Sequence, residues 1–96
     1  MITEEYNFVF IMDEYIKSGE ELADAAALCG DDPIKKDMVA FITPQFDAMC
    51  ARSEGVRAML ENSFAESREF ILIEMVEITK INLDMAEQIR NKIGEL

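Results

Sequence analysis

The chain has 96 residues, a length that fits one domain. Half of the residues are hydrophobic and 30% are charged, which is typical of a folded protein rather than a disordered one. Twenty acidic residues against nine basic ones give a net charge of −11, so direct binding to nucleic acid or to an anionic membrane surface is not expected. No apolar run approaches the ~20 residues of a membrane-spanning helix.

The two cysteines and the first residues of the chain bear on the cellular compartment in which the protein is expected. Acidic residues follow Met1 almost at once, which does not resemble a secretory signal peptide. A reducing, cytoplasmic location is therefore the expectation. In that setting Cys29 and Cys50 are predicted to be free, partly buried thiols rather than a disulfide.

A first helix is predicted for residues 3–29. Thr3 can cap its start, and Gly30 is a good C-terminal stop. A stripe of apolar and small residues at 3-4 spacing predicts the face that packs inside a bundle. Its members are Val9, Met12, Ile16, Gly19, Ala23 and Ala26. Ala25 is interpreted as a residue chosen for helix propensity rather than for packing.

Two further features run along the same helix. Phe8, Tyr15 and Leu22 repeat every seven residues beside the predicted stripe. The opposite face is acidic and is predicted to face water, with an acidic docking face as the alternative. Its main members are Asp13, Glu20 and Asp24.

A second helix is predicted for residues 33–42. Asp32 is a suitable N-cap, and Pro33 is favoured in a first helical turn. Pro44 disfavours helical geometry at the residue before it, so a break or sharp kink is predicted at Thr43–Pro44.

The remaining sequence predicts helices over residues 44–62 and 64–93. Ser63 and Glu66 have the spacing of a capping box, which favours a new start there. The apolar pattern stays nearly in phase across this point, so a single helix over residues 44–93 is the alternative. We favour the break.

The last helix carries one apolar stripe with a polar member. Its residues are Ile71, Met75, Ile78, Asn82, Met85 and Ile89. Asn82 is a candidate buried polar residue that could fix the register of the helices, and a water-bonded rim position is the alternative.

Together these patterns predict a single all-α domain over residues 1–96. No alternating strand pattern is present. The expected architecture is a small antiparallel bundle of three long helices, the second broken at Thr43–Pro44, with coiled-coil-like packing.

Two stretches are apolar all round the helix rather than on one face. Residues 8–12 and 70–73 should lie at the same end of an up-down-up bundle and leave an exposed apolar patch. Self-association as a two-fold dimer is the favoured reading. Loops covering the patch in a monomer, or a helix of another protein, are the alternatives. The predicted interaction surface comprises Phe8, Phe10, Ile11, Met12, Tyr15, Phe70, Ile71 and Ile73.

Residue types that carry chemistry are scarce. There is no histidine, which removes the commonest general base and metal ligand, and no Gly-rich phosphate loop is present. Glu74 and Glu77 have helical spacing but are predicted to lie on a solvated outer face. No metal, no cofactor and no catalytic activity are therefore expected.

The sequence thus favours a non-enzymatic protein-interaction module of the adaptor, chaperone or inhibitor kind. Its partner would be a second copy or a helix of another protein. The alternative is an acidic decoy that imitates nucleic acid and blocks a nucleic-acid-binding protein. The near-neutral segment over residues 33–62 weighs against the decoy, because a decoy needs acidic groups over one continuous surface.

Overall fold

The structure is a computed structural model, and it describes the backbone of residues 4–95 and the side chains of residues 7–95. Within that part of the chain every regular element is helical, which confirms the all-α class. The predicted cap at Thr3 lies outside the described residues. In chain order the elements are α1 (Glu4–Ala27), α2 (Pro33–Met38), the 3-10 helix η1 (Ala40–Ile42), α3 (Thr43–Asn62) and α4 (Phe64–Gly94).

Local sequence signals account for the connection between α1 and α3. Gly30 adopts a positive φ of 53°, which glycine tolerates and other residues rarely adopt. The Asp32 carboxylate caps α2 by accepting a hydrogen bond from the Ile34 N–H at 2.9 Å. The predicted break is present but lies earlier than Thr43–Pro44, because α2 ends at Met38 and gives way to η1. Thr43 itself has helical backbone angles and begins α3, with Pro44 in its first turn.

The turn between α3 and α4 settles one alternative and corrects one detail. Ser63 separates two helices, so residues 44–93 do not form one long helix. The predicted capping box is wrong, since the Ser63 side chain makes no capping bond to the helix backbone. Its hydroxyl instead shares a hydrogen bond of 2.9 Å with the hydroxyl of Ser67, one turn further along.

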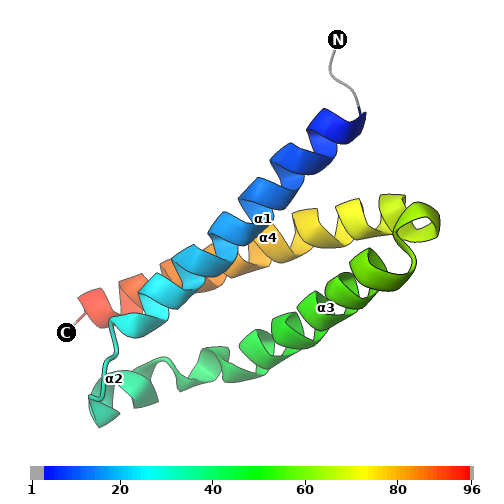
Figure 1. Cartoon of the computed structure of the whole chain (residues 1–96). Coiled ribbons are helices and arrows are strands. Elements are labelled where there is room, and N and C mark those ends of the chain that lie inside the picture. The colour runs from blue at the N-terminus through cyan, green and yellow to red at the C-terminus, as the bar shows by residue number, and fades with distance from the viewer. Residues whose placement is uncertain (1–3, 96) are drawn as a thin grey trace.

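The helices are arranged up-down-up, with α4 as the central element (Figure 1). α3 and α4 form an antiparallel hairpin, and α1 runs along α4 in the same direction as α4 itself. Both α1 and α3 pack extensively on α4 but make hardly any contact with each other. The bundle is therefore open on the side between α1 and α3.

The core follows the central helix. All six residues of the stripe predicted on α4 are buried, and Ala86 joins them, so this prediction is confirmed. Leu22 and Ala25 from α1, and Met49 and Val56 from α3, close over that stripe from the two sides. Each large apolar side chain buried in this way contributes about 1.5–3 kcal/mol.

The open arrangement makes the chain less compact than its length would allow. Its radius of gyration is 15.4 Å, whereas a compact domain of this length has about 12.5 Å. Its accessible surface is 6404 Å², about 800 Å² more than expected for a compact protein of 10.9 kDa. Large apolar side chains such as Val9, Phe10 and Ile34 are exposed on that surface, so the helices leave part of the chain's apolar area uncovered.

Candidate interaction surfaces

The face by which α1 contacts α4 is not the one predicted. The predicted stripe is open except at Met12, which packs partly against the core, and Val9 and Ile16 are 66% and 52% exposed. The residues that pack on α4 lie one position earlier in the sequence and have the same 3-4 spacing. They are Phe8, Ile11, Tyr15, Ser18, Leu22, Ala25 and Cys29.

The reason is the size of the side chains. One position along a helix is a rotation of about 100°, so the two stripes are neighbours and spacing alone cannot separate them. The stripe led by Phe8, Tyr15 and Leu22 is bulkier and buries more apolar area on α4. Ala25 is fully buried in it, which corrects its interpretation as a residue chosen only for helix propensity.

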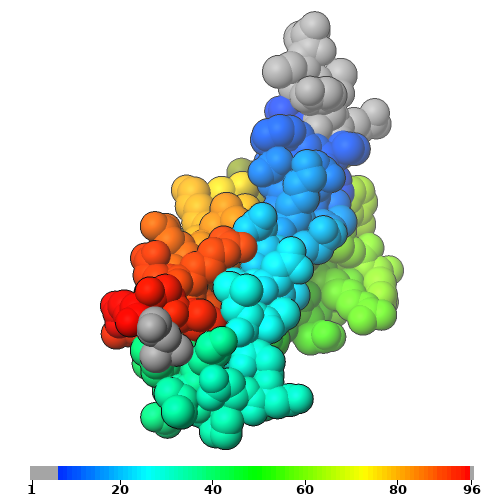
Figure 2. All heavy atoms as spheres, turned by 90° about the vertical axis from the view of Figure 1, so that its left-hand side faces the viewer, coloured from blue at the N-terminus to red at the C-terminus, as the bar shows by residue number. Residues whose placement is uncertain are grey.

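A concave surface, which we call the central groove, lies where α1 and α3 fail to meet. It has a volume of about 550 Å³ and is floored by Leu22 and Asn82. Figure 2 shows the face of the molecule that α1 crosses, with α4 on one side of α1 and the later part of α3 on the other. The walls of the central groove are formed by Gly19, Ala23 and Ala26 of α1 and by Phe46, Met49 and Cys50 of α3.

Acidic side chains border the central groove on both helices. On α1, Glu20 and Asp24 directly follow Gly19 and Ala23 and are exposed. On α3, Glu54 lines the groove itself, and two further exposed acids lie seven residues before and after it. Spacing by seven keeps residues on one face of a helix, so α3 presents a row of acids. The row is Asp47, Glu54 and Glu61.

A second apolar area, which we call the Phe10 surface, lies on the other side of α1. Phe10 and Val76 line a shallow pocket of about 200 Å³ between α1 and α4. Ile73 and Phe70 precede Val76 on α4 by three and six residues, and each interval of three turns about 60° around that helix. Phe10, Phe70 and Ile73 are 57%, 55% and 54% exposed. We define the Phe10 surface by Phe10, Phe70, Ile73 and Val76.

The predicted interaction surface is therefore only partly accessible. Ile71 is fully buried, and its assignment to that surface is wrong because it belongs to the stripe of α4 that forms the core. Phe8, Ile11, Met12 and Tyr15 are partly buried against the core.

Phe8 has a specific partner within the chain. Its ring meets that of Phe64 edge-on, at 5.1 Å between centroids, and the Arg68 guanidinium lies 5.9 Å from the Phe8 ring and 5.8 Å from the Phe64 ring. This cluster joins α1 to the first turns of α4. The two apolar stretches thus meet at the same end of the bundle, as their positions in the sequence suggest.

The polar residue of the core, Asn82, joins α4 to α1. It is 7% exposed, and its side-chain amide donates a hydrogen bond of 3.3 Å to the Ser18 hydroxyl. That hydroxyl donates in turn to the Tyr15 carbonyl at 2.7 Å. Ser18 is itself buried, so the pair forms a polar contact inside an apolar interface. The contact thus joins Ser18 of α1 to Asn82 of α4 within that interface.

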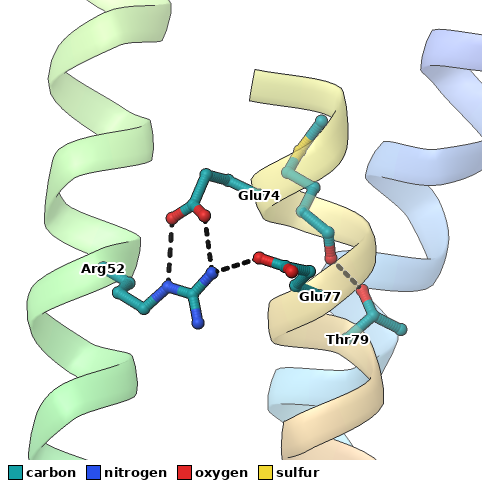
Figure 3. A network of polar contacts seen from close by, with 5 residues as sticks. Arg52, Glu74, Glu77 and Thr79 are labelled. Carbon is teal, nitrogen blue, oxygen red and sulfur yellow. Dashed lines mark hydrogen bonds and ion pairs between the residues drawn. The ribbon is translucent and has the colours of Figure 1, made fainter. Parts of the chain in front are cut away.

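A charged network joins α3 to the other side of α4 (Figure 3). The Arg52 guanidinium donates to both carboxylate oxygens of Glu74, at 3.0 and 2.5 Å, and to Glu77 at 2.6 Å. The hydrogen bonds from Arg52 lower the pKa of Glu74 below its ordinary value of 4.5. The hydrogen bonds to Glu74 and Glu77 raise the pKa of Arg52. The expectation that Glu74 lies on a solvated face is wrong, because α3 covers it and leaves its side chain 15% exposed.

The acidic face predicted on α1 does face water. Asp13, Glu20 and Asp24 are exposed, and Asp13 forms an ion pair of 2.9 Å with Lys17. The hydrogen bond between the two side chains and the charge of Asp13 raise the pKa of Lys17. Cys29 is a buried free thiol and Cys50 an exposed one.

Three wider observations bear on what these surfaces can do. Among the described residues no group of acidic or cysteine side chains is clustered as a metal site would require. Over the same part of the chain, no helix has the length and apolar character needed to cross a membrane. No protein-family model, curated protein or solved structure matches the chain.

Proposed function

We propose that this chain is a non-enzymatic protein-interaction module that associates with itself through the Phe10 surface. The observation that carries the proposal is the exposure of three large apolar side chains in the first halves of α1 and α4. Phe10, Phe70 and Ile73 each leave more than half of their surface open to solvent. Apolar areas of this kind commonly mark protein-binding surfaces.

The amount of uncovered surface fits this role. The chain exposes about 800 Å² more than a compact protein of its mass. One partner in a standard protein–protein interface buries about the same area. In a two-fold dimer each contact is made twice, so one apolar side chain contributes in both protomers.

A module is preferred over the acidic decoy because of where the acids lie. Glu20, Asp24 and Glu54 border an apolar groove instead of forming a continuous charged face. Alternating apolar and acidic rows are what a helix-binding surface presents. As part of the proposal we retain a reducing, cytoplasmic setting, supported by the two free thiols.

The test is a substitution at the centre of the Phe10 surface. We expect wild-type protein to sediment as a dimer at tens of micromolar, and Phe10→Glu to raise the dimer dissociation constant at least about tenfold. Helix content should be unchanged, because the Phe10 ring is 57% exposed in the single chain. Sedimentation equilibrium and circular dichroism measure the two properties.

A matched control is Ile34→Glu, which places the same charge on an apolar residue of α2 that is 65% exposed. It should leave the dimer intact. The net charge of −11 opposes self-association, so the dimer should tighten when salt is raised. A wild-type chain that remains monomeric at about 100 µM in high salt would contradict self-association.

A further inference from the structure

We infer that the central groove binds a basic amphipathic helix of another protein. The inference rests on the proposed role as an interaction module, but it concerns a different surface from the Phe10 surface. It follows from the shape of the groove, the small residues in one wall and the charges along both rims.

The shape suits a helix. α1 and α3 both pack on α4 and leave a concave space between them, with Leu22 and Asn82 as its floor. A fourth helix placed there would contact both walls and close the bundle. The central groove is lined on α1 from Gly19 to Ala26, about 11 Å of helix axis, so it accommodates about two turns of a bound helix. The rest of a longer helix would extend along the exposed residues Val9 and Ile16 of α1.

The wall formed by α1 allows close approach. Gly19, Ala23 and Ala26 have small side chains, and the distance between packed helices depends on the side chains at the contact. The opposite wall is larger and adaptable, because Phe46 and Met49 supply apolar area and Met fits irregular partners. An apolar side chain of the bound helix would be held between the two walls.

The charges along the rims specify the partner. Glu20 and Asp24 border one wall, while Asp47 and Glu54 border the other, and none of the four forms an ion pair among the described residues. Helices that pack in a coiled-coil manner place charged residues beside their apolar seam. A bound helix with Lys or Arg beside its seam would find acidic partners on both sides.

A second copy of this chain is a poor occupant. It carries a net charge of −11, and α1 has one basic residue, Lys17, against a series of acids. In α3, Arg52 is engaged with Glu74 and Glu77, and Arg57 with Glu61. Over their described residues, neither α1 nor α3 therefore offers the basic rows that the groove calls for.

The test uses two synthetic peptides of about 18 residues, labelled with a fluorophore. One repeats Leu at heptad core positions with Lys on both flanks. The other has the same composition in a scrambled, non-amphipathic order, and it reports pure charge attraction. Fluorescence anisotropy gives both affinities for the full-length protein. We expect micromolar binding of the ordered peptide and at least tenfold weaker binding of the scrambled one.

Cys50 reports whether the peptide occupies the groove. Its thiol is exposed in the groove wall, whereas Cys29 is buried and serves as an internal reference. The ordered peptide should slow modification of Cys50 by a maleimide at least about fivefold, with Cys29 unaffected. Cys50→Ser identifies which thiol produces the signal.

Matched glycine variants separate steric blocking from loss of the fold. A side chain at Gly19 meets no atom within 4 Å, and the same holds at Gly55, which lies on α3 away from the groove. Arg is a better helix former than Gly, so both Gly19→Arg and Gly55→Arg should fold at least as stably as wild type. Gly19→Arg should weaken ordered-peptide binding at least tenfold, and Gly55→Arg less than about twofold.

A charge-reversed pair completes the design. Glu54→Lys, in the groove, should weaken peptide binding more than Glu87→Lys, which makes the same change at an exposed site on α4 outside the groove.

Three results would overturn the inference: no ordered-peptide binding up to about 100 µM, equal binding to Gly19→Arg, or equal binding of the scrambled peptide. A fourth is protection of Cys50 that rises with protein concentration in the absence of peptide, since a second copy would then fill the groove. Dimerisation through the Phe10 surface is measured separately by sedimentation. Failure of the peptide test with an intact dimer would reject the groove alone.

Discussion

α4 and α1 are both long helices with apolar residues at 3-4 spacing, yet they are covered very differently. α4 has α1 on one side and α3 on the other, and the apolar stripe that faces both of them is buried throughout. α1 carries two such stripes side by side and packs against α4 with only one of them. The stripe that contains Val9 and Ile16 stays open.

The difference shows how sequence pattern relates to burial. A helix with one apolar stripe and two neighbours has one way to pack, so its pattern predicts its core. A helix with two adjacent stripes and one neighbour must leave one uncovered. That uncovered stripe is a packing deficit of the single chain, and it is where a partner is to be expected.

The largest effect should come from matched substitutions that compare the two helices directly. Ile78 on α4 is fully buried, while Ile16 on α1 is 52% exposed. Ile78→Ala should lower the free energy of unfolding by about 2–5 kcal/mol, because it removes transfer energy and leaves a cavity. Ile16→Ala should change it by less than about 0.5 kcal/mol. Urea denaturation of both variants at low protein concentration measures the contrast.

A large loss in Ile16→Ala would break the comparison. Repeating the denaturation over a range of protein concentrations then identifies the cause. A loss that grows with concentration would place Ile16 in an interface between copies. A loss that is independent of protein concentration would mean that Ile16 is covered within the single chain.

The same contrast explains how far the sequence could predict the molecule. The all-α class, the break before Thr43 and the buried stripe of α4 follow from proline and periodicity, which are local properties. The break at Ser63 is present, although the capping box that predicted it does not form. The packed face of α1 does not, because the two stripes differ in bulk and not in spacing. Adding Ile11, Ser18 and Ala25 to the heptad repeat of Phe8, Tyr15 and Leu22 would have revealed the competing stripe.

The candidate surfaces were less predictable than the elements. The exposure of Phe10 follows from its position outside both stripes of α1. The central groove exists because α1 and α3 make hardly any contact with each other. That separation is a property of the tertiary structure, and local sequence patterns do not predict it. The bonds from Arg52 to Glu74 and Glu77 also join positions more than 20 residues apart, where single-helix spacing gives no signal.

An intermediate effect should come from the contact that fixes α1 on α4. Ser18→Ala removes the acceptor for the Asn82 amide inside an apolar interface, so it should lower the free energy of unfolding by about 1–2 kcal/mol. Replacing both partners, as in Ser18→Ala with Asn82→Leu, should restore much of the loss. A double-mutant cycle from urea denaturation measures the coupling between the two residues.

That cycle sharpens the comparison, because it tests whether α1 needs a polar contact to select one of its two stripes. If the double variant is stable but its Cys29 becomes accessible to a maleimide, α1 has rotated or shifted toward its other stripe. Simple additivity of the two single losses would argue that the Ser18–Asn82 bond does not couple the helices.

The smallest effect should arise on the other side of α4, where Arg52 of α3 binds Glu74. Glu74→Gln should lower the free energy of unfolding by about 1 kcal/mol near neutral pH, since the pair is only partly buried. Arg52 holds the pKa of Glu74 below 4.5 in the folded chain, so the stabilisation is present above pH 4.5 and is lost as the pH falls below that value.

The difference in unfolding free energy between wild type and Glu74→Gln should therefore disappear in acid. Urea denaturation near pH 7 and near pH 3 measures it, with Glu77→Gln, whose side chain is 56% exposed, as the weaker control. An unchanged gap at both pH values would mean that the carboxylate charge of Glu74 does not stabilise the α3–α4 hairpin.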